Sequence, residues 1–170
     1  LLQQVVNLNH GTYLEEELKG NNGTTFCIGV AGYPEKHFEA PNMEIDLMHL
    51  KKKVDAGSDY IVTQMFFDNK KFFAFEKACR DAGITVPIIP GLKPITSKKQ
   101  LSVIPRTFHV DIPSDLSAAV LKCKDDAAVE IVGAEWLLTQ SKELKEASVP
   151  VLHYYTLGKP TVIAAVVKAL

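Results

Sequence analysis

The chain has 170 residues, of which 46% are hydrophobic, enough to bury one sizeable core, so we expect a single domain over residues 1–170. The 19 Lys and Arg residues balance 20 Asp and Glu residues, which excludes the basic surplus typical of nucleic-acid-binding proteins. No apolar run approaches the roughly 20 residues of a membrane span, and no charged-then-apolar leader opens the chain. Three cysteines without a C-x-x-C spacing suit thiols in a reducing compartment, so we expect a cytoplasmic protein.

The amino-terminal part of the chain predicts helix followed by strand. Apolar residues at helical spacing indicate helix over residues 1–19, with a break at Gly11 and a second helical piece over 13–19. A cluster of Gly and Asn residues at 20–23 predicts a turn. Residues 24–33 predict the first strand, and a loop follows it.

The middle of the chain is organised around a strand predicted at residues 59–68. Asn42 is expected to cap the helix before this strand, and Gly57 to end that helix. The nearly continuous apolar run D-Y-I-V-T-Q-M-F-F-D is typical of a strand covered on both faces, as in a parallel sheet. Gln64 interrupts the run near its carboxyl end, where α/β folds place their ligands. Taken alone, this residue favours the simpler interpretation, an amide bonded to neighbouring backbone.

A repeated unit indicates the fold class. The tripeptide D-A-G at 55–57 and again at 81–83 ends a helix just before an apolar strand, and Asp68 is expected to cap the second of these helices. The third strand is predicted at 86–92 and the fourth at 149–157. Four strands, each followed by helix, predict an α/β protein with parallel strands and right-handed crossovers.

Between the third and fourth strands the pattern predicts three helices. The first is expected over 98–104, because Pro105 disfavours a longer helix. The second begins at Ser114, and the third covers 125–147. After the fourth strand, Pro160 fits the first turn of a closing helix.

No short motif identifies a reaction. The histidines lack H-x-x-x-H or C-x-x-C partners, so no metal site is expected. The glycines form neither a dinucleotide-binding nor a P-loop pattern, and there is no G-x-S-x-G elbow. His37, in the loop after the first strand, is most simply interpreted as a solvated side chain. Asp46 and Lys53 suit a ribose and a phosphate if they lie near the mouth of a barrel.

Longer segments resemble a known family. F-C-I-G-V-A-G-Y-P-E-K-H (26–37), D-Y-I-V-T-Q-M-F-F-D (59–68), P-I-I-P-G-L-K-P-I-T-S (87–97), F-H-V-D-I-P (108–113) and V-L-H-Y-Y-T-L (151–157) are similar to methylenetetrahydrofolate reductase, in the same order. The resemblance implies a flavin-binding (β/α)8 TIM barrel, of which this chain carries roughly the last four βα units. It also implies FAD-dependent reduction of 5,10-methylenetetrahydrofolate to 5-methyltetrahydrofolate with NADH or NADPH, in one-carbon metabolism and methionine biosynthesis, by a homo-oligomer.

The resemblance assigns roles to individual positions. The implied cofactor-binding residues are Tyr33, His37, Ala40, Asp46, His49, Lys52 and Lys53. The implied substrate-binding residues are Gln64, Gln100 and Lys159. Gln64 matches a glutamine that contacts folate and nicotinamide in turn, and Lys159 stands where many relatives have arginine. His49 often corresponds to asparagine, and Ile104 lies near a position where many relatives place an aromatic residue.

The same resemblance implies what the chain lacks. The family's general-acid glutamate is expected in an amino-terminal part outside this sequence, so no catalytic residue is expected here, and a fragment of this kind is expected to be inactive alone. The alternative is a non-catalytic half-barrel or truncated paralogue that binds flavin or folate, or pairs with another half. A different barrel that binds a phosphorylated ligand would require the five matched segments to be coincidental.

Overall fold

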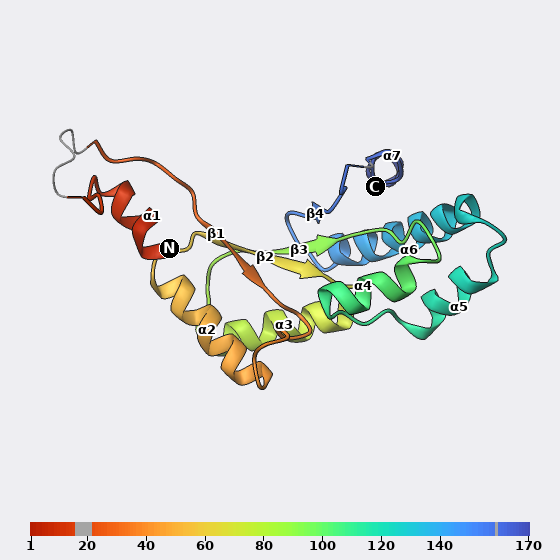
Figure 1. Cartoon of the computed structure of the whole chain (residues 1–170), viewed down its shortest axis with the longest axis horizontal. Coiled ribbons are helices and arrows are strands. Elements are labelled where there is room, and N and C mark those ends of the chain that lie inside the picture. The colour runs from red at the N-terminus through yellow and green to blue at the C-terminus, as the bar shows by residue number, and fades with distance from the viewer. Residues whose placement is uncertain (16–21, 159) are drawn as a thin grey trace.

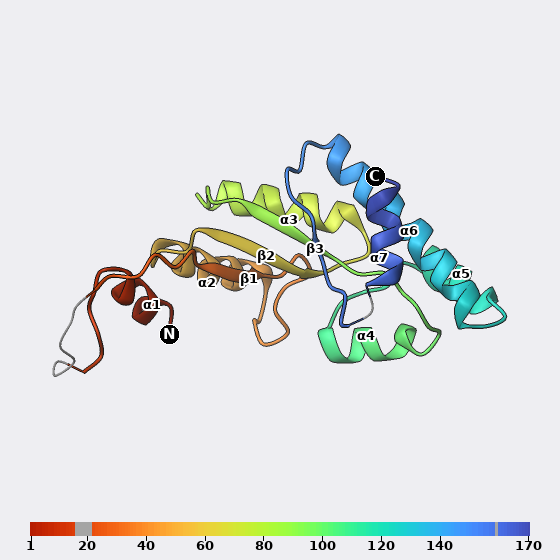
Figure 2. The same cartoon turned by 90° about the horizontal axis from the view of Figure 1, so that it is seen from above.

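The computed structural model describes residues 1–15, 22–158 and 160–170. Its elements follow in the order α1 (Leu2–Asn9), β1 (Gly29–Gly32), α2 (Met43–Asp55), β2 (Tyr60–Met65), α3 (Asn69–Asp81), β3 (Ile88–Leu92), α4 (Gln100–Phe108), α5 (Ser114–Lys122), α6 (Asp126–Glu146), β4 (His153–Tyr154) and α7 (Thr161–Lys168). The four strands form one parallel sheet in the order β1-β2-β3-β4, with helices between successive strands, as an α/β fold requires. In an elongated molecule, α1 lies at one end and α5 at the other (Figures 1 and 2).

The helix ends confirm several sequence predictions. Asn42 Oδ1 accepts a hydrogen bond from the Ile45 amide at 2.9 Å, which caps α2, and Asp68 caps α3 in the same way. Gly57 and Gly83 follow these helices with φ angles of 107° and 74°. Glycine adopts this left-handed conformation without the steric penalty of a side chain, so both helices end where the D-A-G pattern predicts.

Replacing Asn42 with alanine is expected to lower the free energy of unfolding by about 1 kcal/mol, because the first turn of α2 loses its side-chain acceptor. Urea unfolding followed by circular dichroism measures the change. Asn42→Asp keeps an acceptor and should retain most of the stability. If Asn42→Ala and Asn42→Asp unfold at the same urea concentration, the cap does not contribute to stability.

The first strand is shorter than the predicted 24–33, because the backbone at the start of that segment pairs with the end of α1. Asn9, at the end of α1, bonds both backbone groups of Phe26: its Oδ1 accepts from the Phe26 amide and its Nδ2 donates to the Phe26 carbonyl, each at 2.9 Å. The backbone is thereby paired with a side chain instead of a strand. The second helical piece is not formed over residues 13–15, and the rest of it, with part of the predicted turn, falls at 16–21, outside the described residues.

Two other elements differ in length from their predictions. The helix predicted to stop before Pro105 continues to Phe108, because proline removes a single hydrogen bond and its neighbour Ile104 is buried in the core. The fourth strand is confined to His153 and Tyr154 within the predicted 149–157. Pro150 has no amide hydrogen to donate, so the ladder cannot begin at the start of that segment.

Two clusters of buried side chains hold these elements together. The first packs the sheet against α2, α3, α6 and α7, and it includes Ile61, Phe72 and Leu137. The second lies around α4, α5 and the start of α6, and it includes Ile104 and Leu116. Because α6 contributes to both clusters, it joins the sheet to the helices that follow β3.

The central strand is less fully covered than its apolar run predicts. Along β2, Ile61, Thr63 and Met65 are buried, whereas Tyr60, Val62 and Gln64 on the other face are half-buried. The register between β2 and β3 shifts between Val62 and Met65. There the Thr63 hydroxyl oxygen accepts a hydrogen bond from the Gly91 amide at 2.9 Å, in place of a backbone carbonyl. This irregularity includes Gln64, and bulges of this kind often adjust the direction of a functional side chain.

Candidate functional site

A cavity of about 290 Å3 lies beside the carboxyl end of β1, between the β1–α2 loop and α2. Its lining residues are Tyr33, His37, Glu39, Ala40, Pro41, Asp46, His49 and Lys53. Six of these eight are among the seven cofactor-binding positions that the family resemblance implies. The seventh, Lys52, is exposed on α2 and does not line the cavity.

One face of α2 supplies the charged side of this cavity. Asp46, His49 and Lys53 are three and four residues apart, so successive turns of the helix place them in one row. The Lys53 ammonium donates a hydrogen bond to the Ala31 carbonyl at 3.2 Å, which holds it at the end of β1. An ammonium has three donors, and two of them stay available for a ligand at this position.

The loop supplies the aromatic side of the cavity and is tied to α2. The Asp46 carboxylate accepts a hydrogen bond from the His37 amide at 2.8 Å. The Tyr33 ring meets the His37 ring edge-on, with centroids 4.6 Å apart. Burial raises the pKa of the Tyr33 phenol, and the nearby Asp46 charge raises it further, so Tyr33 remains a hydrogen-bond donor at neutral pH.

Lys36 closes the same loop on itself. Its φ of 77° is a left-handed conformation that costs a non-glycine residue about 1–2 kcal/mol. Its ammonium donates to the carbonyls of His37, at 2.9 Å, and Ala40, at 2.5 Å. These two charge-assisted bonds hold the strained turn and fix the backbone on which His37 and Ala40 are presented.

Next to Lys36, Glu35 connects three segments that are distant in sequence. One Glu35 oxygen accepts hydrogen bonds from the Lys71 ammonium, at 2.8 Å, and from the Asp111 amide, at 2.8 Å. The Lys71 ammonium also donates to the Asp111 carboxylate at 2.5 Å. This Glu35–Lys71–Asp111 network joins the β1–α2 loop to α3 and to the segment between α4 and α5.

Burial decides the protonation behaviour of this network. The Glu35 side chain is only 9% exposed, and this burial raises its pKa more than the hydrogen bond from Lys71 lowers it. Burial lowers the pKa of Lys71, but its bonds to Asp111 and Glu35 outweigh that effect and raise it overall. The hydrogen bond from Lys71 lowers the pKa of Asp111. Lys71 therefore keeps its positive charge. Of its two carboxylate partners, the more exposed one, Asp111, is the one whose charged form it stabilises most.

The predicted substrate-binding residues do not gather in one cavity. The Gln64 oxygen accepts from the Met65 amide at 2.9 Å, which matches the simpler interpretation of this residue, and its side chain borders a narrow cavity of about 10 Å3 with Tyr33 and His109. The Gln100 oxygen accepts from the Thr96 amide at 2.7 Å, in the segment that precedes α4. Lys159 lies outside the described residues. Ile104 is only 2% exposed, so its side chain belongs to the core.

Sequence reasoning missed one aromatic contact at this end of the sheet. The Phe38 ring, which is 57% exposed, stacks on the His109 ring with centroids 4.6 Å apart. His109 ends α4 in a left-handed conformation with a φ of 55°. The two residues are 71 positions apart in the chain, so no local pattern signals their contact.

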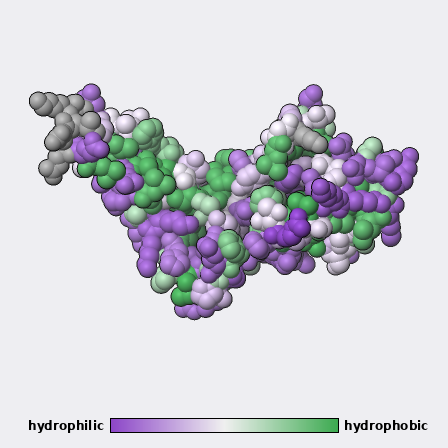
Figure 3. Space-filling model, viewed as in Figure 1, coloured by the Kyte–Doolittle hydropathy of each residue, from purple (hydrophilic) through white to green (hydrophobic). Residues whose placement is uncertain are grey.

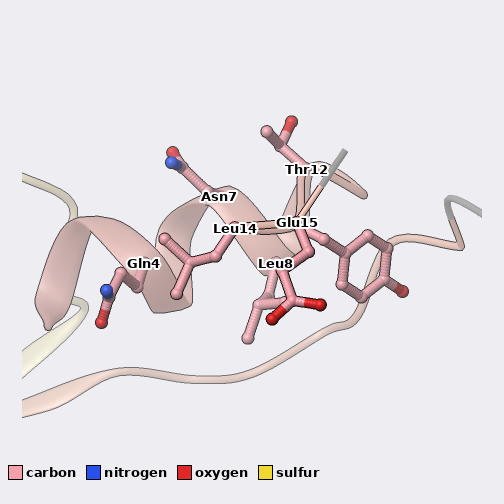
Figure 4. Close-up of a pocket in the computed structure, with 7 residues that line it drawn as sticks. Gln4, Asn7, Leu8, Thr12, Leu14 and Glu15 are labelled. Carbon is pink, nitrogen blue, oxygen red and sulfur yellow. The ribbon is translucent and has the colours of Figure 1, made fainter. Parts of the chain in front are cut away.

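Other features of the described residues do not belong to this site. A cavity of about 320 Å3 lies at α1 and is lined by side chains such as Gln4, Asn7 and Leu14 (Figure 4), none of them implicated by sequence. Within the described ranges, no three His, Cys, Asp or Glu side chains converge as metal ligands. None of the helices described is both long and apolar enough to cross a membrane.

Comparisons with known proteins place the chain in a family. The family model described as methylenetetrahydrofolate reductase matches residues 3–170. The 5,10-methylenetetrahydrofolate reductase of Salmonella typhimurium is 38% identical over 146 residues, covering 85% of this chain and 49% of the relative. A probable methylenetetrahydrofolate reductase (NADPH) of Caenorhabditis elegans is 37% identical over 150 residues, covering 87% of this chain and 23% of the relative.

A solved structure agrees at the level of the fold. It is an uncharacterized protein from Clostridium thermocellum that binds two copies of 5-methyl-5,6,7,8-tetrahydrofolic acid. It is 19% identical, with a TM-score of 0.54, and the match covers 83% of this chain and 51% of that protein. The chain thus spans about half the length, or less, of the proteins it matches. With the family model covering residues 3–170 and relatives near 38% identity, the chain belongs to the methylenetetrahydrofolate reductase family.

Proposed function

We propose that this chain supplies the flavin-nucleotide and folate-binding portion of an enzyme that reduces 5,10-methylenetetrahydrofolate to 5-methyltetrahydrofolate with NADH or NADPH. Residues 1–170 would form one domain, the carboxyl-terminal portion of a (β/α)8 barrel. The observation that carries the proposal is the cavity beside β1, which is lined by Tyr33, His37, Asp46 and Lys53. Family membership and four parallel strands support it.

The chemistry of the cavity fits part of FAD. A cavity of about 290 Å3 is at the small end of ligand sites, so it suits one portion of a dinucleotide. Lys53 supplies positive charge for a phosphate, and the Asp46 carboxylate supplies acceptors for ribose hydroxyls. The Tyr33 and His37 rings supply flat surfaces for a base. When bound, FAD supplies the hydride-transfer chemistry that links the nicotinamide to the methylene carbon of the folate.

The residues of this chain would bind and orient the reactants. Lys53 and Asp46 hold the nucleotide, and the loop fixed by Lys36 keeps His37 in place against it. Gln64 has its oxygen engaged by the Met65 amide, so its two N–H donors remain for folate or nicotinamide. Gln100 would contact the substrate after leaving its bond to Thr96, and Lys159 would hold a glutamate carboxylate of the folate. No residue of this chain is assigned a proton-transfer step.

Exposed apolar side chains beside the edge strands favour a second candidate function, a half-barrel that pairs with another half. Hydrophobic residues reach the surface in the hollow between the arm with α1 and the part with α6 and α7 (Figure 3). Phe26, ahead of β1, is 53% exposed, and Val151, ahead of β4, is 52% exposed. Large apolar side chains that precede both edge strands of a parallel sheet need cover, which the rest of a barrel or a second copy would provide.

Lys53→Met is expected to weaken FAD binding at least about tenfold, because a phosphate loses its cation. The measurement is equilibrium dialysis of FAD against the purified chain, read by the flavin's visible absorbance. Lys142→Met, on the exposed side of α6, makes the same charge change away from the cavity and should bind FAD as the wild type does. No FAD binding by the wild type would contradict the proposal for this chain, and equal weakening by both variants would contradict the site.

A further inference from the structure

The β1–α2 loop is fastened to the chain after α4 by contacts that lie outside the cavity beside β1. Five residues make these contacts, and we call them the loop clasp: Glu35 and Phe38 of the loop, Lys71 of α3, and His109 and Asp111 of the segment after α4. None of the five lines the cavity that is proposed to bind the flavin nucleotide. Any effect of the clasp on that cavity must therefore pass through the loop itself.

The polar half of the clasp holds the loop at Glu35. One Glu35 carboxylate oxygen accepts a hydrogen bond from the Asp111 backbone amide and another from the Lys71 ammonium, both at 2.8 Å. The Glu35 side chain is only 9% exposed, and a buried carboxylate that loses its partners is strongly unfavourable, so this attachment resists release. The Asp111 carboxylate also accepts from the Lys71 ammonium, so the loop, α3 and the segment after α4 are joined at one point.

The aromatic half of the clasp holds the loop at Phe38. The Phe38 ring stacks on the His109 ring with an interplanar angle of 21°. Phe38 also contacts the His37 ring, at a centroid distance of 4.9 Å, and the His37 ring meets the Tyr33 ring in turn. The four rings form a continuous row from the end of α4 to two residues that line the cavity. The placement of the His37 ring thus depends on a residue that is distant in the sequence.

The two halves of the clasp lie on either side of a strained residue. Lys36, with its φ of 77°, has a left-handed conformation that few residues other than glycine adopt. Such conformations persist where the surrounding structure holds them. The loop and the segment after α4 are close enough to do so, because the cavity that they line together with Gln64 measures about 10 Å3, room for about one water molecule. Release of the clasp would let Lys36 relax and would move the next residue, His37.

We propose that the loop clasp positions His37 for the flavin nucleotide, so that Glu35, Lys71 and His109 are positioning residues of the proposed site although they lie outside its cavity. This inference rests on the function proposed above. A loop that is free to leave its binding conformation spends less time in it, and the apparent dissociation constant rises in inverse proportion to the fraction of molecules in that conformation. The clasp therefore sets the affinity for FAD through the population of one loop conformation.

Equilibrium dialysis of FAD against the full chain tests the polar half of the clasp. Lys71→Met is expected to raise the dissociation constant about tenfold, because the binding-competent fraction falls to roughly one tenth. Lys71→Arg keeps a cation that can donate to both carboxylates, and it should bind FAD within about twofold of the wild type. Lys77→Met removes an exposed ion pair with Asp81 from the same helix and should bind as the wild type does. Equal weakening by Lys71→Met and Lys77→Met would contradict the inference.

His109→Asn tests the aromatic half of the clasp. This substitution removes the ring on which Phe38 stacks, and asparagine tolerates the left-handed conformation that His109 adopts at a φ of 55°. The dissociation constant of FAD is expected to rise about fivefold, since the loop keeps its attachment at Glu35 and loses the one at Phe38. Circular dichroism at the temperature of the dialysis verifies that each variant is folded.

A double-mutant cycle separates positioning from a general loss of stability. In a His37→Ala background the ring that the clasp positions is absent, so adding Lys71→Met or His109→Asn should change the dissociation constant by less than about twofold. Equal losses with and without the His37 ring would overturn the inference, as would wild-type affinity in both Lys71→Met and His109→Asn. Either result leaves the proposed function standing, because the wild type binds FAD in both. No FAD binding by the wild type would overturn the proposed function, and this inference with it.

Discussion

Replacing Gly133 with alanine is expected to lower the free energy of unfolding by at least about 3 kcal/mol, because α6 packs directly against the chain at Ile95. A Cβ atom at Gly133 would lie 1.8 Å from the Ile95 carbonyl oxygen. That oxygen belongs to backbone, so the overlap is relieved only if the helix moves. Alanine would otherwise favour a helix by about 1 kcal/mol relative to glycine, so any loss of stability reports the packing.

Gly83→Ala is the matched comparison for this variant. Gly83 has a φ of 74°, but the nearest atom to its Cβ position is 3.6 Å away, so its cost is the backbone conformation alone, about 1 kcal/mol. Urea unfolding of both variants, followed by Trp136 fluorescence and by circular dichroism, measures the difference. A Gly133→Ala protein as stable as the wild type would mean that α6 does not approach Ile95 this closely.

Replacing Lys71 with methionine is expected to lower the free energy of unfolding by about 2 kcal/mol at pH 8, because Glu35 is left as a buried carboxylate without its cation. The estimate lies below the usual range for breaking a buried ion pair, since the Lys71 side chain is 33% exposed and solvent screens its charge. Lys70→Met removes a neighbouring exposed lysine of the same helix and should change stability by less than about 0.5 kcal/mol.

The loss of unfolding free energy caused by Lys71→Met should depend on pH in a defined direction. The pKa of Glu35 is raised in the folded protein, so the contribution of Glu35 is complete below its unfolded pKa and is lost as the pH rises through the folded value. Removing Lys71 raises the pKa of Glu35 further, so the protein loses more stability as the pH rises. The pKa of Asp111 is lowered by Lys71, and this stabilisation is present only above the unfolded pKa of Asp111.

Both effects act in the same sense, so the difference in stability between wild type and Lys71→Met should be small at pH 4 and grow toward pH 8. Urea unfolding at several pH values measures it, with Lys70→Met as the reference. A difference that stays constant over this range would show that the network contributes through packing of the lysine stem and not through charge.

Local chemistry explains which parts of the fold the sequence predicts well. Asn42 and Asp68 cap their helices through bonds to amides two or three residues away, and Gly57 and Gly83 supply left-handed turns, so their signals are contained in a few residues. The continuation of α4 past Pro105 was not predictable in this way. It depends on the burial of Ile104 against residues from other elements, and that tertiary packing outweighs the lost hydrogen bond.

The candidate site also combines features that the sequence predicts with features that it does not. The positions lining the cavity beside β1 were identified by resemblance, and α2 brings Asp46, His49 and Lys53 together through simple helical spacing. The bonds of Glu35 to Lys71 and Asp111 span 36 and 76 positions, and no periodicity in one sequence reveals them. Gly133 resembles a weak point in a helix when read locally, and only the neighbouring Ile95 carbonyl shows why alanine does not fit there.

The long connection between β3 and β4 has a consequence for how this protein changes over evolutionary time. Leu92 and His153 lie on adjacent strands, and α4, α5 and α6 fill the chain between them. Doubling the length of a flexible connection adds only about 0.6 kcal/mol of closure entropy, so insertions in the turns that join these helices burden the sheet little. The cavity beside β1 is built within one short crossover, whereas a cavity of about 620 Å3 among α3, α5 and α6 takes most of its residues from the long one. Selection can therefore reshape this second cavity while the β1 cavity is preserved.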